Sequence, residues 1–239
     1  MVGVLLLVWV LTFLRTAPSA AADKFESIKS LVGPNDSLLV ADPEGRPIIK
    51  KNENKKLIPA SILKLLTSLI AFHYLGPNFR YTTEFYLDKQ SNFKIKGFGD
   101  PLLISEIINE ISARLSDLIG GSIVLNNLVV DDSHFNQPLT IPGISSSPQP
   151  YDAPNGALCV NFNTVFFKQV KSGYTSAEDQ TPLLPYAEKK IRALSLKSGR
   201  FVLSHVGKEN TVYAGKLFQY FLSQEGMKFS GQVKPGRVN

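Results

Sequence analysis

The sequence has a single cysteine, Cys159, so the 239-residue chain cannot form an intramolecular disulfide. Cys159 lies in the apolar run 157–160, a setting typical of a packed thiol rather than a catalytic one. Histidine is also scarce: His73, His134 and His205 lie far apart and have no Cys or His neighbours at ligand spacing. We therefore predict no metal site.

Two groups of functional signatures are missing as well. No Gly-x-Ser-x-Gly turn is present to host a Ser-His-Asp triad. No helix-turn-helix, zinc-finger or aromatic RNA-binding pattern occurs. The formal net charge is +6, and the basic residues are scattered except at Lys50–Lys51 and Lys55–Lys56. Such a charge distribution suits a protein working near anionic polymers, and we predict no nucleic acid partner.

Long hydrophobic runs are absent after residue 22, but one lies before it. Residues 2–14 form an almost unbroken apolar stretch, and the small residues at 17–22 suit a signal peptidase. About 13 apolar residues are too few to span a bilayer comfortably. We predict a signal peptide over residues 1–22, cleaved near Ala22, and export to the periplasm or beyond. Because no Lys or Arg precedes the apolar stretch, a retained N-terminal anchor is the alternative.

The rest of the sequence indicates a folded chain of mixed structure. With 44% hydrophobic residues, it can form one or two globular cores. Short strand patterns alternate with separated helical patterns, which favours an α+β fold. The expected strands cover 36–40, 47–49, 81–87, 93–96 and 123–130; the expected helices follow Ser61 and cover 103–118 and 213–224; further elements cover 160–170 and 201–205, and 138–154 is irregular.

The run 59–67 carries the main candidate for chemistry. Ser61 and Lys64 are three residues apart at the start of an apolar helical pattern, so they share one helix face. Pro59 favours the start of a helix at this point. The N-terminal end of that helix would stabilise negative charge that develops near Ser61. The apolar residues that follow predict a buried central helix, and burial favours the neutral amine that a general base needs. Ser61 is the candidate nucleophile and Lys64 the candidate base.

A purely structural interpretation of the same residues stays open. Ser-x-x-Lys spacing occurs by chance in many chains of this size. Ser61 would then cap the helix, and Lys64 would extend its amine to the surface.

Several runs in this order resemble a known family. They are Pro59–Thr67, Leu75–Thr83, the Gly-x-Gly-Asp-Pro-x-Leu loop 97–103, Val130–Phe135, Tyr151–Pro154 with Asn163, and Tyr213–Gly215 with Leu222, Gly226, Met227 and Gly231. Together they are similar to the exported D-alanyl-D-alanine carboxypeptidase/endopeptidases of the class C, type-4 penicillin-binding protein group. The resemblance covers nearly all of the chain after residue 22.

The resemblance implies a fold and a function. It implies a β-lactamase/transpeptidase-like domain, incomplete here, interrupted by an inserted α+β domain. Residues 23–84 would begin the transpeptidase-like domain, 85–210 would form the insert, and 211–239 would return to the first domain. The family cleaves D-Ala-D-Ala ends and cross-links of peptidoglycan through an acyl-serine intermediate that penicillins mimic. Peptidoglycan peptides and β-lactams are the implied partners, with no cofactor.

The sequence also departs from the family pattern. The family's Ser-x-Asn and Lys-Thr-Gly motifs are absent, and Lys171–Gly173 and Lys197–Gly199 are only Lys-Ser-Gly runs inside the expected insert. The sequence therefore resembles the N-terminal half of a longer enzyme, from a truncated frame or gene fragment. We expect impaired activity. The alternative is a catalytically inert fragment that serves as a cell-wall or partner-binding module.

Overall fold

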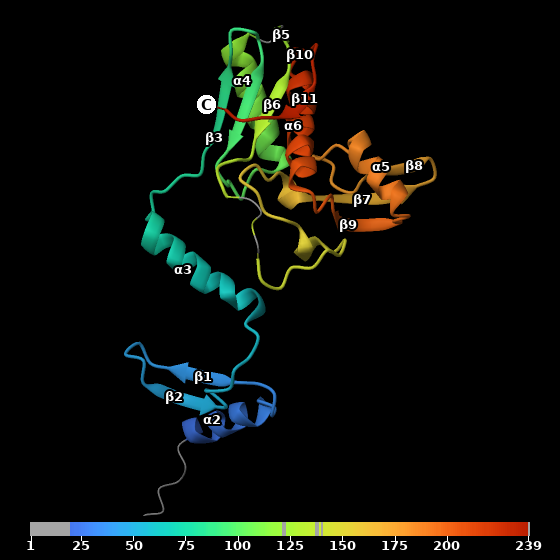
Figure 1. Ribbon diagram of the computed structural model, residues 1–239. Helices are drawn as coiled ribbons and strands as arrows, with labels where there is room; N and C mark the ends of the chain where they lie inside the picture. Colours follow the sequence, from blue (N-terminus) through green and yellow to red (C-terminus); the bar gives the residue numbers. More distant parts are fainter. Residues whose placement is uncertain (1–19, 121–122, 137–138, 140, 239) are drawn as a thin grey trace, which may run out of the picture. The chain divides into compact units, whose positions relative to one another are not determined.

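The computed structural model describes residues 20–120, 123–136, 139 and 141–238 (Figure 1). The predicted signal peptide lies almost wholly outside these residues. The chain forms two compact units, Met1–Pro77 and Asn78–Asn239. No helix within the described ranges is long and apolar enough to cross a bilayer.

The first unit has a helix, a hairpin and a second helix. Helix α2 (Ala20–Leu31) is followed by strands β1 (Leu38–Ala41) and β2 (Pro47–Lys51), which pair antiparallel as the sequence predicted. The turn closes because Asp42 accepts a 2.8 Å hydrogen bond from the Arg46 N–H and Gly45 adopts a φ of +82°. Lys51 Nζ donates to the carbonyls of Lys29 and Val32, at 2.8 and 2.6 Å. These bonds tie the hairpin to the end of α2.

The second unit is built on a four-stranded sheet in the order β11-β6-β4-β3. The hairpin β3 (Thr83–Leu87) and β4 (Phe93–Gly97) is antiparallel and was predicted. Strands β6 (Leu128–Asp131) and β11 (Val233–Pro235) extend it by parallel pairing. The strand expected over 123–130 is interrupted: β5 (Val124–Leu125) leaves the sheet and pairs with β10 (Lys228–Phe229). Asn126 and Asn127 bridge the gap by bonding to the β3–β4 turn.

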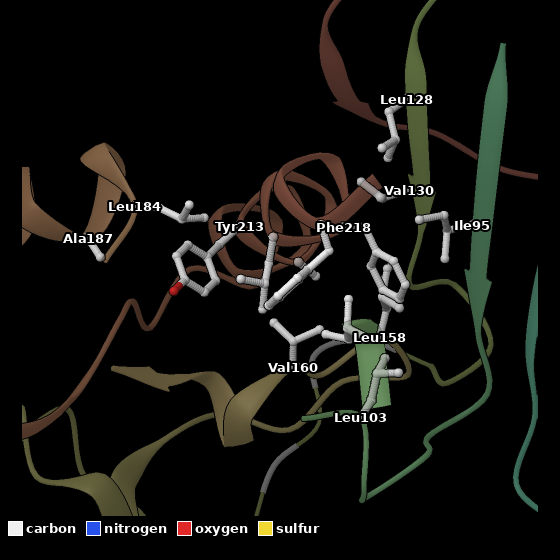
Figure 2. Close-up of a cluster of buried hydrophobic side chains, with 14 of the residues drawn as sticks. Ile95, Leu103, Leu128, Val130, Leu158, Val160, Leu184, Ala187, Tyr213 and Phe218 are labelled. Atoms are coloured by element: carbon white, nitrogen blue, oxygen red, sulfur yellow. The ribbon is translucent and has the colours of Figure 1, made fainter. Parts of the chain in front are cut away.

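Two long helices pack on this sheet. They are α4 (Ser105–Ile119), which begins two residues after the start of the helix expected over 103–118, and α6 (Gly207–Gln224), which contains the helix expected over 213–224. Gly215 of α6 lies against the sheet, where an added Cβ would meet the side chains of Val233 and Val130 at 2.5 and 2.8 Å. Glycine at this position therefore lets the helix approach the strands closely. Figure 2 shows the resulting core, in which Tyr213 of α6 lies beside Leu184 and Ala187, and Phe218 lies toward Val130 and Leu158.

A second sheet has the order β8-β7-β9. Its strands β7 (Thr164–Val170), β8 (Gly173–Ser176) and β9 (Ser198–Val202) are all antiparallel, and helix α5 (Pro185–Ala193) lies between β8 and β9 in the sequence. The sequence did not predict β8 or α5. The expected element over 160–170 begins instead with the short helix η3 (Asn161–Asn163).

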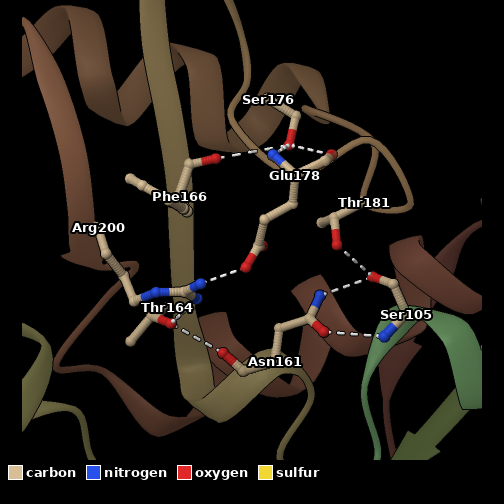
Figure 3. Close-up of polar contacts among 8 residues, drawn as sticks. All are labelled: Ser105, Asn161, Thr164, Phe166, Ser176, Glu178, Thr181 and Arg200. Carbon is tan, nitrogen blue, oxygen red and sulfur yellow. Dashed lines mark hydrogen bonds and ion pairs between the residues drawn. The ribbon is translucent and has the colours of Figure 1, made fainter.

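The three residues of η3 all have positive φ, at 47°, 59° and 53°. This left-handed conformation costs an L-residue about 1–2 kcal/mol, although asparagine tolerates it. Hydrogen bonds hold the turn in place (Figure 3): Asn161 accepts from the Ser105 N–H and donates to its hydroxyl, both at 2.9 Å. Thr181 donates to the same Ser105 hydroxyl at 3.0 Å. The turn thereby fixes the start of α4 to the second sheet.

The two units differ from the predicted domain limits. Residues 211–238 lie in the second unit, because α6 packs on α4 and β11 pairs with β6. The division falls at Pro77 rather than at residue 84, since β3 pairs with β4. The α+β class is confirmed, and the assignment of 211–239 to a transpeptidase-like domain stays a prediction.

Candidate functional site

Ser61 lies in the short 3-10 helix η1 (Ala60–Ile62), directly before helix α3 (Leu63–Leu75). Ala60 has a φ of +45°, a left-handed conformation that is uncommon without glycine. The backbone closes around it, because the Ile62 N–H donates to the Pro59 carbonyl at 3.0 Å. Ser61 thus lies at the head of α3, as the sequence predicted, on a tight turn that the sequence did not predict.

Lys64 follows in the first turn of α3, three residues after Ser61. Both side chains are exposed. Within the described residues neither the Ser61 hydroxyl nor the Lys64 amine has a hydrogen-bond or ion-pair partner. The structure therefore keeps the Ser-x-x-Lys spacing at the head of α3, and no described group orients either side chain.

The prediction that the helix after Ser61 is buried is wrong for the chain that the structure describes. None of its residues is buried, and Leu65 and Leu69 are 74% and 66% exposed. The reason is that the first unit has no opposing layer. Its sheet is the two-stranded β1–β2 hairpin, and Ile49 is its only buried hydrophobic residue within the described ranges. A lone hairpin cannot cover an apolar helix on all sides.

The residues of the loop 97–103 that match the family pattern have structural roles in the described chain. A Cβ at Gly97 would overlap the Ala157 carbonyl, and one at Gly99, where φ is +85°, would lie 2.6 Å from the Phe135 ring. Asp100 accepts a 2.9 Å hydrogen bond from the Leu102 N–H and so closes the turn. The glycines and the aspartate of this loop are thus explained by backbone approach and turn formation.

The acidic residues of the other family-like runs are engaged by backbone donors. Asp131 accepts from the N–H groups of Ser133 and Val238, at 2.8 and 2.7 Å. Asp132 accepts from the Leu158 N–H at 2.6 Å, and burial raises its pKa. Asp152 accepts from the Ser145 N–H at 2.7 Å, and hydrogen bonds from Ser145 and Ser147 lower its pKa to about 2. These carboxylates organise loops of the second unit.

The two Lys-Ser-Gly runs belong to the sheet β8-β7-β9. Lys171–Gly173 forms the turn between β7 and β8, and Gly173 has a φ of +133°. Lys197–Gly199 leads into β9, where Ser198 pairs with Lys168. Both runs lie in the second unit, whereas Ser61 lies in the first. Their positions are those of hairpin and strand-end residues.

Cys159 behaves as the packed thiol that its sequence context indicated. Burial, helped by the negative charge of Asp132, raises its pKa to about 12. A thiol with such a pKa is almost entirely protonated at neutral pH and is a poor nucleophile. Within the described residues no group of three or more His, Cys, Asp and Glu side chains could hold a metal ion.

Sequence reasoning missed two features of the second unit. One is the ion pair between Arg200 and Glu178, drawn in Figure 3 beside the Asn161 turn. The other is a cavity of about 680 Å³ beside the N-terminus of α6. Neither has a local sequence signal, because the residues that form each of them come from separate stretches of the chain.

Comparisons with known proteins place the chain in a family. A model of the D-Ala-D-Ala carboxypeptidase 3 (S13) family matches residues 29–200, well over half of the chain and including Ser61 and Lys64. A crystal structure of penicillin binding protein 4 from Haemophilus influenzae has a similar fold, with a TM-score of 0.59 at 16% identity. That match covers 90% of this chain and 56% of the other chain.

A second crystal structure of the Haemophilus influenzae protein, complexed with a novel β-lactam, matches with a TM-score of 0.49 at 16% identity. It covers 90% of this chain and 55% of the other. The chain therefore spans about half the length of the solved structures it matches. From the family match over residues 29–200, the chain belongs to the D-Ala-D-Ala carboxypeptidase 3 (S13) family.

Proposed function

We propose that Ser61 and Lys64 are the nucleophile and general base of a serine-type D-Ala-D-Ala carboxypeptidase/endopeptidase that acts on peptidoglycan peptides. The supporting observation is their spacing at the head of α3, inside the region matched by the family. Ser61 Oγ would attack the carbonyl of the penultimate D-Ala while Lys64 takes its proton. The C–N bond to the terminal D-Ala would break as Lys64 returns the proton to the leaving nitrogen, and water would then hydrolyse the acyl-serine ester.

The exposure of α3 limits this chemistry. An oxyanion hole and a proton relay must be arranged around the serine, and no described residue of the first unit supplies them. One missing oxyanion donor costs about 10²–10³ in rate, and general acid–base help contributes about 10²–10⁴. We expect efficient turnover only where further sheet and side chains cover α3, and very slow acylation otherwise.

The proposed substrate, peptidoglycan, is a cell-wall polymer, so the proposal includes a function at the cell wall. Export through the apolar N-terminal segment, residues 2–14, agrees with this. We propose a periplasmic or otherwise exported location.

The test is covalent labelling by a fluorescent penicillin, read by intact mass and by mapping of the modified residue. We expect one acyl adduct on Ser61, formed slowly, and no adduct in Ser61→Ala. Ser68→Ala is the matched control, because Ser68 is an exposed serine of the same helix. Labelling that persists in Ser61→Ala would refute the nucleophile.

A second candidate function is binding without catalysis. The observation favouring it is that the well-packed second unit contains nearly all of the buried core, whereas the Ser61 helix is exposed. Retention on purified peptidoglycan that is unchanged in the double variant Ser61→Ala/Lys64→Ala, with no penicillin adduct on the unmodified chain, would support this function. Absence of retention would count against it.

A further inference from the structure

The cavity of about 680 Å³ lies wholly within the second unit. Its walls are the end of β6 with the residues after it, the first turn of α6, and the end of β11 with residues 236–237. Strands β6 and β11 are parallel, so their carboxyl ends meet at one edge of the sheet, beside α6 (Figure 1). In sheets with parallel strands, ligands commonly bind outside this edge, and the volume is within the range of small-molecule sites.

The two carboxylates in the wall are already engaged by backbone donors. Asp131 is 1% exposed and accepts from two N–H groups. Desolvation opposes ionisation of Asp131, but the hydrogen bonds from Ser133 and Val238 keep its pKa below the usual value. Asp132 accepts from the Leu158 N–H. Both groups therefore hold the wall in place.

The basic groups in the wall have no such partners. Lys208 and Arg237 form no ion pair or side-chain hydrogen bond with any residue that the structure describes, and both line the cavity. Helix α6 has no side-chain N-cap, and the N–H groups of Gly207 and Lys208 have no partner within the same described ranges. The space beside Gly207 is open, since an added Cβ would meet nothing within 4 Å. Two cations and two free N–H groups are thus available to one ligand.

The remaining lining is largely apolar. Val206 and Pro235, both exposed, line the cavity. An inorganic anion alone would leave these surfaces uncovered, whereas an anion carried on a small apolar body would bury them.

We propose that this cavity binds a small organic anion, with a carboxylate or phosphate group facing Lys208 and Arg237 and an apolar body against Val206 and Pro235. The site requires neither Ser61 nor Lys64. Its ligand is recognised by charge and by the burial of its apolar part.

The test is a nuclear magnetic resonance titration of the full chain with benzoate, phenyl phosphate and uncharged benzamide. We expect either or both anions to shift the amide signals of Gly207 and Lys208 at millimolar concentration, and benzamide to leave them unchanged. A larger effect of one anion identifies the preferred head group. The double variant Lys208→Ala/Arg237→Ala should bind at least about tenfold more weakly, because it loses two charge-assisted contacts.

Lys228→Ala is the matched control, because Lys228 is an exposed lysine outside the cavity. It should bind as the unmodified chain does, and so should Ser61→Ala. If the double variant does not fold, Lys208→Gln and Arg237→Gln are titrated singly. No shift with either anion, equal binding of benzamide, or equal weakening in Lys228→Ala would overturn the proposal.

Discussion

Single residues of the second unit are constrained mainly by backbone approach. Gly97 ends β4 where the chain passes the backbone of Ala157 and Leu158, and the Gly99 N–H donates to the Ala157 carbonyl at 2.7 Å. A residue at such a crossing is selected for the absence of a side chain. Close backbone approach therefore accounts for the glycines of the loop 97–103 without any contact to a substrate.

We predict that Gly97→Ala destabilises the chain by about 2–3 kcal/mol, because its Cβ would overlap the Ala157 carbonyl and lie 2.7 Å from the Leu158 Cα. Urea unfolding followed by circular dichroism measures this change. Gly207→Ala is the control, and its free energy of unfolding should stay within about 0.5 kcal/mol of the unmodified value. Equal effects of the two substitutions would contradict the steric account.

Glu209 gives the fold a dependence on pH. Its carboxylate accepts from Lys190 Nζ at 2.8 Å and from the Ser204 hydroxyl at 2.6 Å. These bonds, with Lys190 contributing most, lower its pKa from 4.5 to about 2. A carboxylate with a lowered pKa stabilises the fold above its unfolded pKa and loses that contribution as the pH falls through the folded value.

We therefore predict that stability decreases as the pH falls from about 5 to about 2, and that Glu209→Gln reduces this slope. Thermal unfolding at several pH values provides the measurement. Glu110→Gln, at an exposed position of α4, should keep the unmodified slope. A slope that is the same in the unmodified chain and in Glu209→Gln would refute the role of this carboxylate.

At the scale of elements, α3 is the more apolar of the two helices α3 and α6, yet it is the exposed one. Leu217 of α6 is fully buried, whereas Leu66 of α3 is 52% exposed. The sequence predicted burial for the helix after Ser61, and over 213–224 it predicted a helix without stating its burial. The difference arises because α6 packs on α4 and on the four-stranded sheet, whereas the first unit provides only a hairpin.

We predict that Leu217→Gln destabilises the chain by about 3 kcal/mol or more, since it removes packed methyl groups and buries an amide. Leu66→Gln should change stability by less than about 0.5 kcal/mol, because leucine and glutamine have similar helix propensity and the site is exposed. Denaturant titration of the two variants compares them directly. A large loss of stability in Leu66→Gln would mean that α3 is covered in solution.

For the whole molecule, the two units have unequal cores. Among the described residues of the first unit only Ile49 is a buried hydrophobic residue, whereas the core cluster of the second unit extends across its four-stranded and three-stranded sheets. The stability of a unit depends on the apolar area that it buries, so the first unit should open more readily.

We predict that limited proteolysis of the full chain cleaves first within residues 52–77 and leaves a resistant product that begins near residue 78. Mass spectrometry of the time course identifies the product. Digestion of the second unit at the same rate as the first would contradict the unequal cores.

The features that could be predicted from the sequence are those set by interactions between residues close together in the chain. Hairpins such as β1–β2 and β3–β4, the helix after Ser61 and the spacing to Lys64 depend on turn residues and periodicity within a few positions, so they could be predicted. The Ser61–Lys64 run also carried the family resemblance that the family match bears out. These features need only neighbours in the sequence.

The tertiary structure decided what depends on distant residues. The parallel pairing of β6 with β4 and β11, the left-handed turn at 161–163 and the cavity beside α6 join segments that have no local signal. The bond from Lys96 to the Val238 carbonyl, for example, spans 142 positions. The exposure of α3 belongs here as well. An apolar pattern shows that a helix can be buried, whereas only the surrounding layers decide whether it is.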